Sequence, residues 1–163
     1  MAIDISPALA ADMLNAAKTA LDGGKLYYYA GPVPANANAA LDMVTLHTEL
    51  AVISLNSTAT GLTFATATGS QLNKTVAEIW AGLVAFDGKD AASTTLTPTF
   101  WRFAPSGDNG RAAGTGTTKR VQGTLGGPDS TADLLLGAAT LTRNGTNTES
   151  VTVFRLRALP VSG

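Results

Sequence analysis

The side chain best suited to acid–base catalysis near neutral pH occurs once in this chain, as His47. It falls in an alternating stretch that we expect to be a strand, with Glu49 on the same face. A general base is conceivable there, but a solvated histidine on an exposed strand face is the commoner role. A single histidine and no cysteine also argue against a zinc site and exclude thiolate chemistry.

Acidic residues stand beside glycine at residues 87–90 (Asp-Gly-Lys-Asp) and 108–110 (Asp-Asn-Gly). Both stretches look like fragments of calcium loops, yet neither has the ligand spacing of an EF-hand. Asp and Asn beside Gly are normal in β turns, so we predict turns at both places. Asp87 and Asp90 are the carboxylate pair on which an enzyme of this composition would depend, and we do not expect an enzyme.

Residues 114–119 (Gly-Thr-Gly-Thr-Thr-Lys) could suggest a phosphate cradle. They lack the Gly-Lys-Ser/Thr order of a P-loop, and no helix clearly follows them. We therefore expect a flexible loop over residues 106–118, and no cofactor.

Three tyrosines in a row, at residues 27–29, could form a stacking platform for a sugar or a base. A platform for nucleic acid would also need a basic groove, which Lys25 alone does not make. Tyrosine suits a protein core or a protein interface equally well, because it offers apolar area with a polar tip. We expect core or interface packing.

Two further groups could contact a partner. Arg155 and Arg157 would project from one face of the last expected strand, either into solvent or onto acidic groups of another protein. Residues 1–5 could reach a neighbouring subunit as an N-terminal arm. The candidate interface residues are therefore Ile3, Ile5, Tyr27, Tyr29, Arg155 and Arg157.

The composition limits the class of protein. The chain has 163 residues, which favours one domain. Charged residues make up 14%, against about 25% in an average globular protein, so Thr, Ser, Asn and Gly must cover much of the surface. Such a surface suits a protein packed against other subunits, although a neutral soluble β domain would share it.

The charge pattern bears on partners and location. The net charge is −1 and no basic block exceeds Lys119-Arg120, so we expect no nucleic-acid partner. No apolar run approaches the roughly 20 residues of a membrane span, so we expect no membrane partner. The start Met-Ala-Ile-Asp lacks the basic and apolar parts of a signal peptide, which predicts synthesis in a cytoplasm without export by the usual route.

A helix is predicted over residues 7–22. Ser6 is a good N-cap, Pro7 a good first residue, and Gly23-Gly24 a good stop. We expect its apolar stripe to pack on a sheet or on a neighbouring subunit. The stripe comprises Leu9, Met13, Ala17 and Leu21, with Leu14 and Ala20 beside it.

The rest of the chain has the texture of short strands separated by turns. Residues 76–86 fit a helix as well as a strand, and we expect a strand over 83–86 because a turn signal follows. The expected strands are 25–29, 44–55, 63–65, 83–86, 99–103, 120–125, 133–136 and 151–157.

Seven or eight such strands predict a mainly β protein, an antiparallel sandwich or jelly roll with one short N-terminal helix. We expect residues 6–163 to form this single β-sandwich domain after an arm of residues 1–5. The loop at 106–118 is the one candidate linker, and it lies between two strands.

The order of these parts resembles a group of small virion proteins of tailed bacteriophages. The resemblance rests on Gly-Lys-Leu-Tyr-Tyr-Tyr at residues 24–29, then Pro32-x-Pro34 and a loop of Ala and Asn. The resemblance covers most of the chain as a general order of elements rather than as a diagnostic motif. The chain departs from this order at residues 69–81, where it carries extra residues. The corresponding parts are residues 9–21, 26–30, 46–55, 100–103 and 151–160.

This resemblance implies a structural protein of the particle, and some such proteins are capsid decoration, or cement, proteins. We therefore expect the chain to bind the major capsid protein on the capsid exterior, as a dimer or trimer, after synthesis in the host cytoplasm. The alternative is a tail, neck or fibre component that binds a host glycan. Glycan binding would require Tyr27, Tyr29 or Trp101 to be exposed on a common face.

Overall fold

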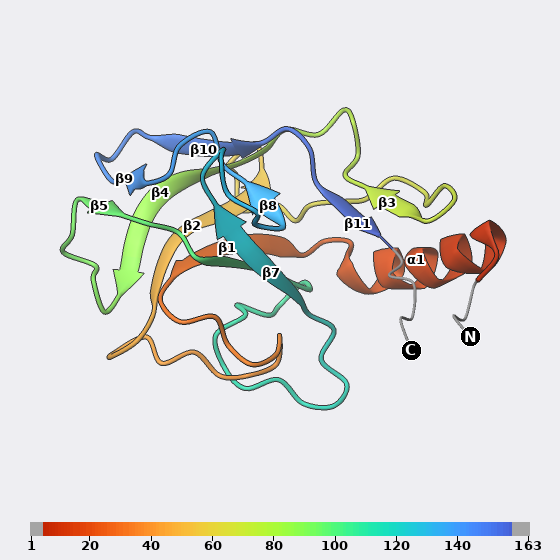
Figure 1. The fold of residues 1–163 in the computed structure, drawn as a ribbon, viewed down its shortest axis with the longest axis horizontal. Helices are drawn as coiled ribbons and strands as arrows, with labels where there is room; N and C mark the ends of the chain where they lie inside the picture. The colour runs from red at the N-terminus through yellow and green to blue at the C-terminus, as the bar shows by residue number, and fades with distance from the viewer. Residues whose placement is uncertain (1–4, 158–163) are drawn as a thin grey trace.

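The structure is a computed structural model that describes residues 5–157, in which one helix is followed by eleven strands (Figure 1). The mainly β class with a short N-terminal helix is thereby confirmed. The elements are α1 Pro7–Leu21, β1 Lys25–Ala30, β2 Thr48–Leu55, β3 Gln71–Asn73, β4 Trp80–Gly88, β5 Thr95–Leu96, β6 Phe100–Ala104, β7 Val121–Gly126, β8 Leu134–Leu135, β9 Leu141–Thr142, β10 Thr148–Val151 and β11 Arg155–Arg157.

A curled seven-stranded sheet forms the body, in the order β10-β4-β2-β1-β6-β7-β8 (Figure 1). Every neighbouring pair is antiparallel except β7 and β8, which are parallel. The pairs β3–β11 and β5–β9 form two small additional sheets. This arrangement agrees with a sandwich-like fold, and it places β1 at the centre of the large sheet.

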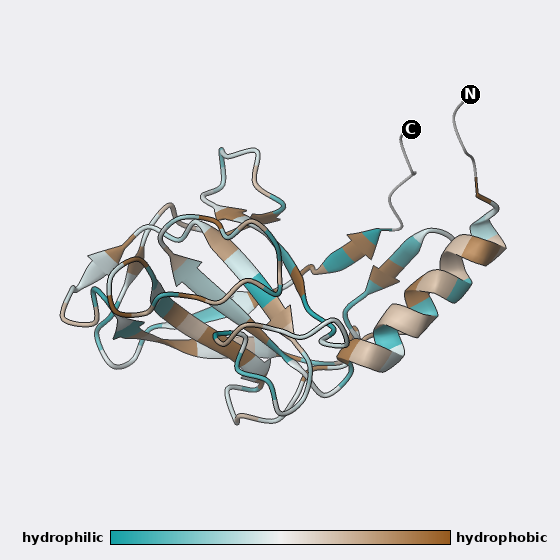
Figure 2. Ribbon diagram, turned by 90° about the horizontal axis from the view of Figure 1, so that it is seen from below, coloured by the Kyte–Doolittle hydropathy of each residue, from teal (hydrophilic) through white to brown (hydrophobic). Residues whose placement is uncertain are grey.

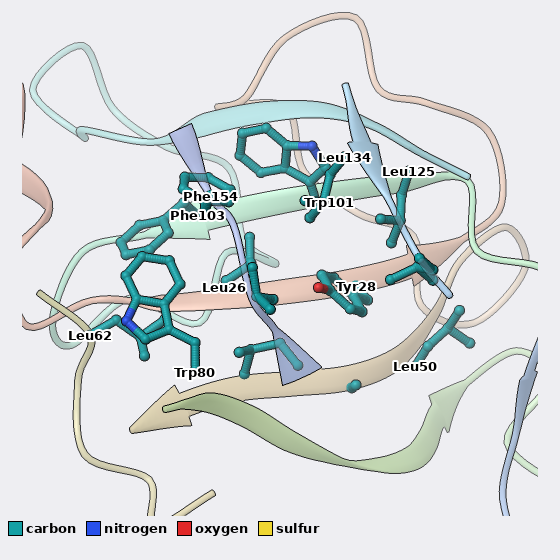
Figure 3. Close-up of a cluster of buried hydrophobic side chains, with 14 of the residues drawn as sticks. Leu26, Tyr28, Leu50, Leu62, Trp80, Trp101, Phe103, Leu125, Leu134 and Phe154 are labelled. Carbon is teal, nitrogen blue, oxygen red and sulfur yellow. The ribbon is translucent and has the colours of Figure 1, made fainter. Parts of the chain in front are cut away.

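The main core lies inside the curl of this sheet (Figure 3). Trp80 and Phe103, from β4 and β6, lie with ring centroids 6.1 Å apart, and Phe154 packs on both. Leu26 and Tyr28 of β1 point into the same cluster and are fully buried. Burial of this many aromatic and aliphatic side chains is the dominant favourable contribution to folding.

A second, smaller core lies on the opposite face of β1. Tyr27, Tyr29, Phe100 and Leu41 are its large buried members. Two long loops, residues 31–47 and 105–120, cover this face and run beside one another in Figure 1. The loops are joined by backbone hydrogen bonds, from Leu41 N to Arg111 O at 2.8 Å and from Gly114 N to Asn38 O at 2.8 Å. β1 is therefore buried on both faces.

The helix begins and ends where its caps predict. The hydroxyl of Ser6 accepts a hydrogen bond from Leu9 N at 3.3 Å, and Gly23 takes the left-handed φ of +82° just past the end. Two side chains fasten the helix to the segment that follows β2. Asn15 Oδ1 accepts from Ala67 N at 2.9 Å, and Asp22 Oδ1 accepts from Phe64 N at 2.8 Å.

The buried face of α1 is not the expected one. Ala10, Leu14 and Leu21 are buried, whereas Leu9 and Met13 are 50% and 54% exposed. The apolar pattern of the helix contains two overlapping stripes, each with helical spacing, and the sequence alone does not say which one meets the sheet. The prediction that Leu9 and Met13 share the packed stripe is wrong for this chain's own sheet.

The expected strand 44–55 begins later, at Thr48. Before it, Asp42 closes a turn: its carboxylate accepts from the backbone N–H groups of Val44 at 3.0 Å and Thr45 at 2.9 Å, and its carbonyl accepts from His47 N at 2.8 Å. Local bonds of an aspartate to nearby N–H groups compete with a strand ladder. Val44 is consequently 82% exposed instead of lying on a strand face.

The expected strand 151–157 is also wrong as a single element. It divides into β10, which pairs with β4, and β11, which pairs with β3. The alternation breaks between Val153, which is exposed, and Phe154, which is buried in the core. The expected strand 63–65 is wrong as a strand, because this segment makes only an isolated bridge, between Phe64 and Lys74. The expected strands 25–29, 83–86, 99–103, 120–125 and 133–136 each correspond to an observed strand, namely β1, β4, β6, β7 and β8.

Candidate interaction surfaces

His47 packs inside the fold rather than lying exposed on a strand. Its side chain is buried, with Nε2 3.0 Å from the carbonyl oxygen of Pro32 and Nδ1 3.2 Å from that of Asp42. The ring meets Phe100 edge-on at a centroid distance of 5.9 Å. The prediction of a solvated strand histidine is wrong because the strand starts after it, and the ring fills the base of the 31–47 loop instead.

The side chains of Tyr27 and Tyr29 are buried in the folded protein, and Tyr29 is 0% exposed. The Tyr29 ring stacks on Phe100 at 4.9 Å, and the Tyr27 hydroxyl donates to the carbonyl of Asp108 at 3.2 Å. Burial, followed by the nearby Glu49 carboxylate, raises the pKa of Tyr27 to about 12. The rings therefore pack in the core, which is one of the two roles expected for them, and loops of the same chain rather than a partner cover them.

The aromatic platform for a glycan is also missing. Trp101 is buried and belongs to the main core, on the face of β6 opposite to Phe100. Tyr27 and Tyr29 belong to the smaller core, so the three rings share no face.

A buried carboxylate anchors the 105–120 loop to the sheet. Glu49, on β2, accepts from Arg111 Nε at 3.1 Å, and Arg111 also reaches Asp87 at 2.6 Å. Burial raises the pKa of Glu49 although Arg111 donates to its carboxylate, so loss of water outweighs the ion pair.

Arg102 is the most deeply buried charged residue in the part of the chain that the structure describes, with 0% exposure. Its guanidinium donates to the carbonyl of Ala39 at 3.1 Å, to the carbonyl of Gly110, and to Gln122 Oε1 at 2.9 Å. These partners lie on both covering loops and on β7, so the planar donor group joins three segments. Burial lowers the pKa of Arg102. In the sequence, the feature that indicates this role is a lone arginine within an aromatic strand.

The Asp-Asn-Gly stretch forms a turn with an anchoring role. Asp108 Oδ1 accepts from Arg120 Nη2 at 2.7 Å and from Gly110 N at 2.8 Å. The hydrogen bonds from Arg120 hold the pKa of Asp108 below its usual range. The Asp108–Arg120 pair, like Arg102 and Glu49, therefore holds loops of the same chain in place.

Arg155 and Arg157 are exposed on β11, as the alternation predicts for residues two apart. Arg155 Nε donates to Asn73 Oδ1 at 2.9 Å, and Figure 1 shows β11 near α1 at one end of the molecule. Ile5 is half-buried, and Ile3 lies outside the described residues.

The half of the large sheet that the loops leave uncovered is hollowed. Two adjoining hollows of about 310 Å³ and 320 Å³ share Lys25 and Ala59. The first extends to Tyr27 and the 105–109 turn, and the second extends over Val52 and Leu83. Both are open and shallow, which suits a macromolecular contact better than an enclosed small molecule.

Within residues 5–157, no three acidic, histidine or cysteine side chains gather closely enough to hold a metal ion. Over the same residues, no helix combines the length and apolar composition that crossing a bilayer requires. No protein-family model, curated protein or solved structure matches this chain. The resemblance to virion proteins therefore stays a prediction.

Proposed function

We propose that the protein is a structural component of a tailed-phage particle, and specifically a decoration protein that binds the capsid lattice and stiffens it. Its action is adhesive. Each copy would bury apolar and hydrogen-bonding surface against neighbouring capsid subunits, and many modest contacts would act together against the pressure of packaged DNA.

The observation that carries this proposal is the second apolar stripe of α1. Leu9, Met13 and Ala16 are exposed and follow helical spacing, while the adjacent stripe packs on the core. A surface helix of a globular protein normally has one apolar face, with polar residues opposite. A helix with a second apolar stripe is typical of an element that packs on two partners, its own sheet and another protein.

The position and surroundings of α1 favour docking. Figures 1 and 2 both show the helix at one end of the molecule, where a neighbour could reach it without contacting the loops. Arg155 and Arg157 are exposed on β11 at the same end, and they would suit acidic groups beside an apolar contact. The buried charged groups that hold the loops, in contrast, already bind groups of the same chain.

The alternative of a glycan-binding tail, neck or fibre component has no comparable support, since its three aromatic residues are buried and share no face.

The test uses heads of the encoding phage assembled without this protein. Purified protein is added, and both its binding and the temperature at which heads rupture are measured. We expect saturable binding and a higher rupture temperature. The variant Met13→Asp should bind at least about 30-fold more weakly, as for a central interface residue.

Val44→Asp is the matched control, because it places the same charge at an exposed valine on the 31–47 loop. We expect it to bind like the original protein. Absence of binding by the original protein, or equal binding by Met13→Asp, would overturn the proposal.

A further inference from the structure

The outward face of β4 is more apolar than the solvated face of an antiparallel strand usually is. Trp80, Val84 and Phe86 point inward and are buried, but the exposed positions between them include Leu83 and Ala85. A strand with one solvated face normally places polar residues outward. Leu83 is 44% exposed, so β4 presents apolar side chains where water would otherwise be expected.

This face of the sheet has an ordered distribution of charge. On β1, Lys25 lies at one end of the uncovered area, next to Ser54 on β2. Val52 and Leu83 lie in the middle of the same hollow. Asp87, which pairs across the strands with Glu49, lies at the other end.

The two ends differ in sign. Glu49 and Asp87 share a single cation, Arg111, so that end carries an excess of negative charge. The Asp87 side chain is 63% exposed and can accept a further cation. Lys25, at the opposite end, forms no ion pair with any described residue.

We propose that this face, defined by Lys25, Val52, Leu83, Ala85 and Asp87, is the interface of a homodimer with a twofold axis near Leu83. The rotation places the apolar middle of one copy on that of the other. It also brings Lys25 of each copy over Asp87 of its partner, so both charged ends are matched at once.

A second copy is the occupant because the face is complementary to itself. A twofold interface uses the same patch on both subunits, so charges within it are matched when groups of opposite sign lie on either side of the axis. Lys25 and Asp87 flank Leu83 in that way. A patch of one sign would indicate a partner of opposite charge instead. The proposal concerns the protein alone in solution, so it stands or falls separately from capsid binding.

The first test is sedimentation velocity over a concentration series. The original protein should dimerise, and Leu83→Asp should raise the dimer dissociation constant at least about 30-fold. Met13→Asp, at an exposed apolar site on α1 away from β4 (Figure 1), should leave dimerisation unchanged. Dimerisation that Met13→Asp abolishes and Leu83→Asp leaves intact would place the contact on α1 and overturn the proposal, as would a monomeric original protein.

The second test is a charge exchange. Lys25→Asp and Asp87→Lys should each weaken the dimer about fivefold, because each places like charges together twice across the axis. The double variant restores opposite charges and should recover most of the affinity. Far-ultraviolet circular dichroism and melting temperature confirm that each variant is folded. Failure of recovery in a folded double variant would refute the twofold arrangement.

Discussion

Arg102 shows how one residue can hold two loops. Its guanidinium donates to carbonyl groups on both covering loops and to Gln122 on β7. Removing it would leave several buried acceptors without donors, and each such group costs about 1–3 kcal/mol. The smaller core beneath those loops therefore depends on a charged residue as well as on its aromatic rings.

We predict that Arg102→Met lowers the free energy of unfolding by about 3 kcal/mol or more, measured by urea denaturation. Hydrogen exchange should quicken at the amides of Leu41 and Gly114, which join the loops. The exposed Arg157→Met is the control and should change stability by less than about 0.5 kcal/mol. Equal stability of both variants would contradict the role assigned to Arg102.

Asp108 makes part of the stability depend on pH. Hydrogen bonds from Arg120 lower its pKa in the folded state, so the folded protein favours the ionised carboxylate more than the unfolded chain does. That contribution is fully present above the unfolded value, about 3.9, and is lost as the pH falls through the folded pKa.

We therefore predict that Asp108→Asn destabilises the protein at pH 7, and that the difference from the original protein shrinks as the pH falls below about 4. Urea midpoints measured from pH 7 to pH 2.5 test this. Asp129→Asn, at an exposed position, serves as the control. A destabilisation by Asp108→Asn that stayed constant across this range would show that the ionised carboxylate is not its source.

At the scale of elements, the turn after β2 is held in an unfavourable backbone conformation. Asn56, Ser57 and Ala59 have φ values of 52°, 57° and 67°. A residue with a Cβ atom in this left-handed region costs about 1–2 kcal/mol, except that asparagine tolerates it better. The turn also borders the uncovered half of the sheet, through Ser57 and Ala59.

We predict that Ala59→Gly raises the free energy of unfolding by about 0.5–1 kcal/mol, because glycine adopts this conformation freely. Ala92→Gly, in a turn with ordinary φ, is the comparison and should lower it by up to about 1 kcal/mol. Thermal unfolding of both variants shows whether each substitution raises or lowers the free energy of unfolding. A loss of stability in Ala59→Gly would mean that the turn is not strained.

The elements that sequence predicts well here are those whose signal is local. The caps of α1 and the aromatic strands β1 and β6 follow from residues within a few positions of each other. The strand at 44–55 fails because Asp42 forms a competing turn, and the strand at 151–157 fails because its halves pair with different partners. Neither cause is visible in the alternation of side chains.

At the scale of the whole molecule, the sequence shows which residues are apolar but does not predict which surfaces remain exposed to solvent. Tyr27 and Tyr29 have the composition of an interface, yet loops from distant parts of the chain cover them. Leu83 is apolar and yet exposed, because those loops reach only one half of the sheet. Candidate surfaces therefore depend on long-range loop placement, which residue patterns do not encode.

The two proposed surfaces make a prediction together. If both proposals hold, a dimer formed through Leu83 would carry two copies of α1 and would bind the capsid lattice at two points. The second contact is then intramolecular, and linked binding of this kind exceeds single binding by about 10²–10⁴-fold when the geometry permits both contacts. Figure 1 shows α1 at one end of the molecule, away from β4, so the α1 helices of both subunits would remain accessible in this dimer.

We predict that monomeric Leu83→Asp binds capsids at least about 100-fold more weakly than the dimer, although its own α1 is unaltered. Binding isotherms on heads lacking the protein measure this, with Val44→Asp as the control of equal charge. The Leu83→Asp monomer should still compete for the same sites at high concentration, whereas Met13→Asp should not. Equal affinity of monomer and dimer would show that the spacing of the two helices does not match the lattice, and that each copy binds alone.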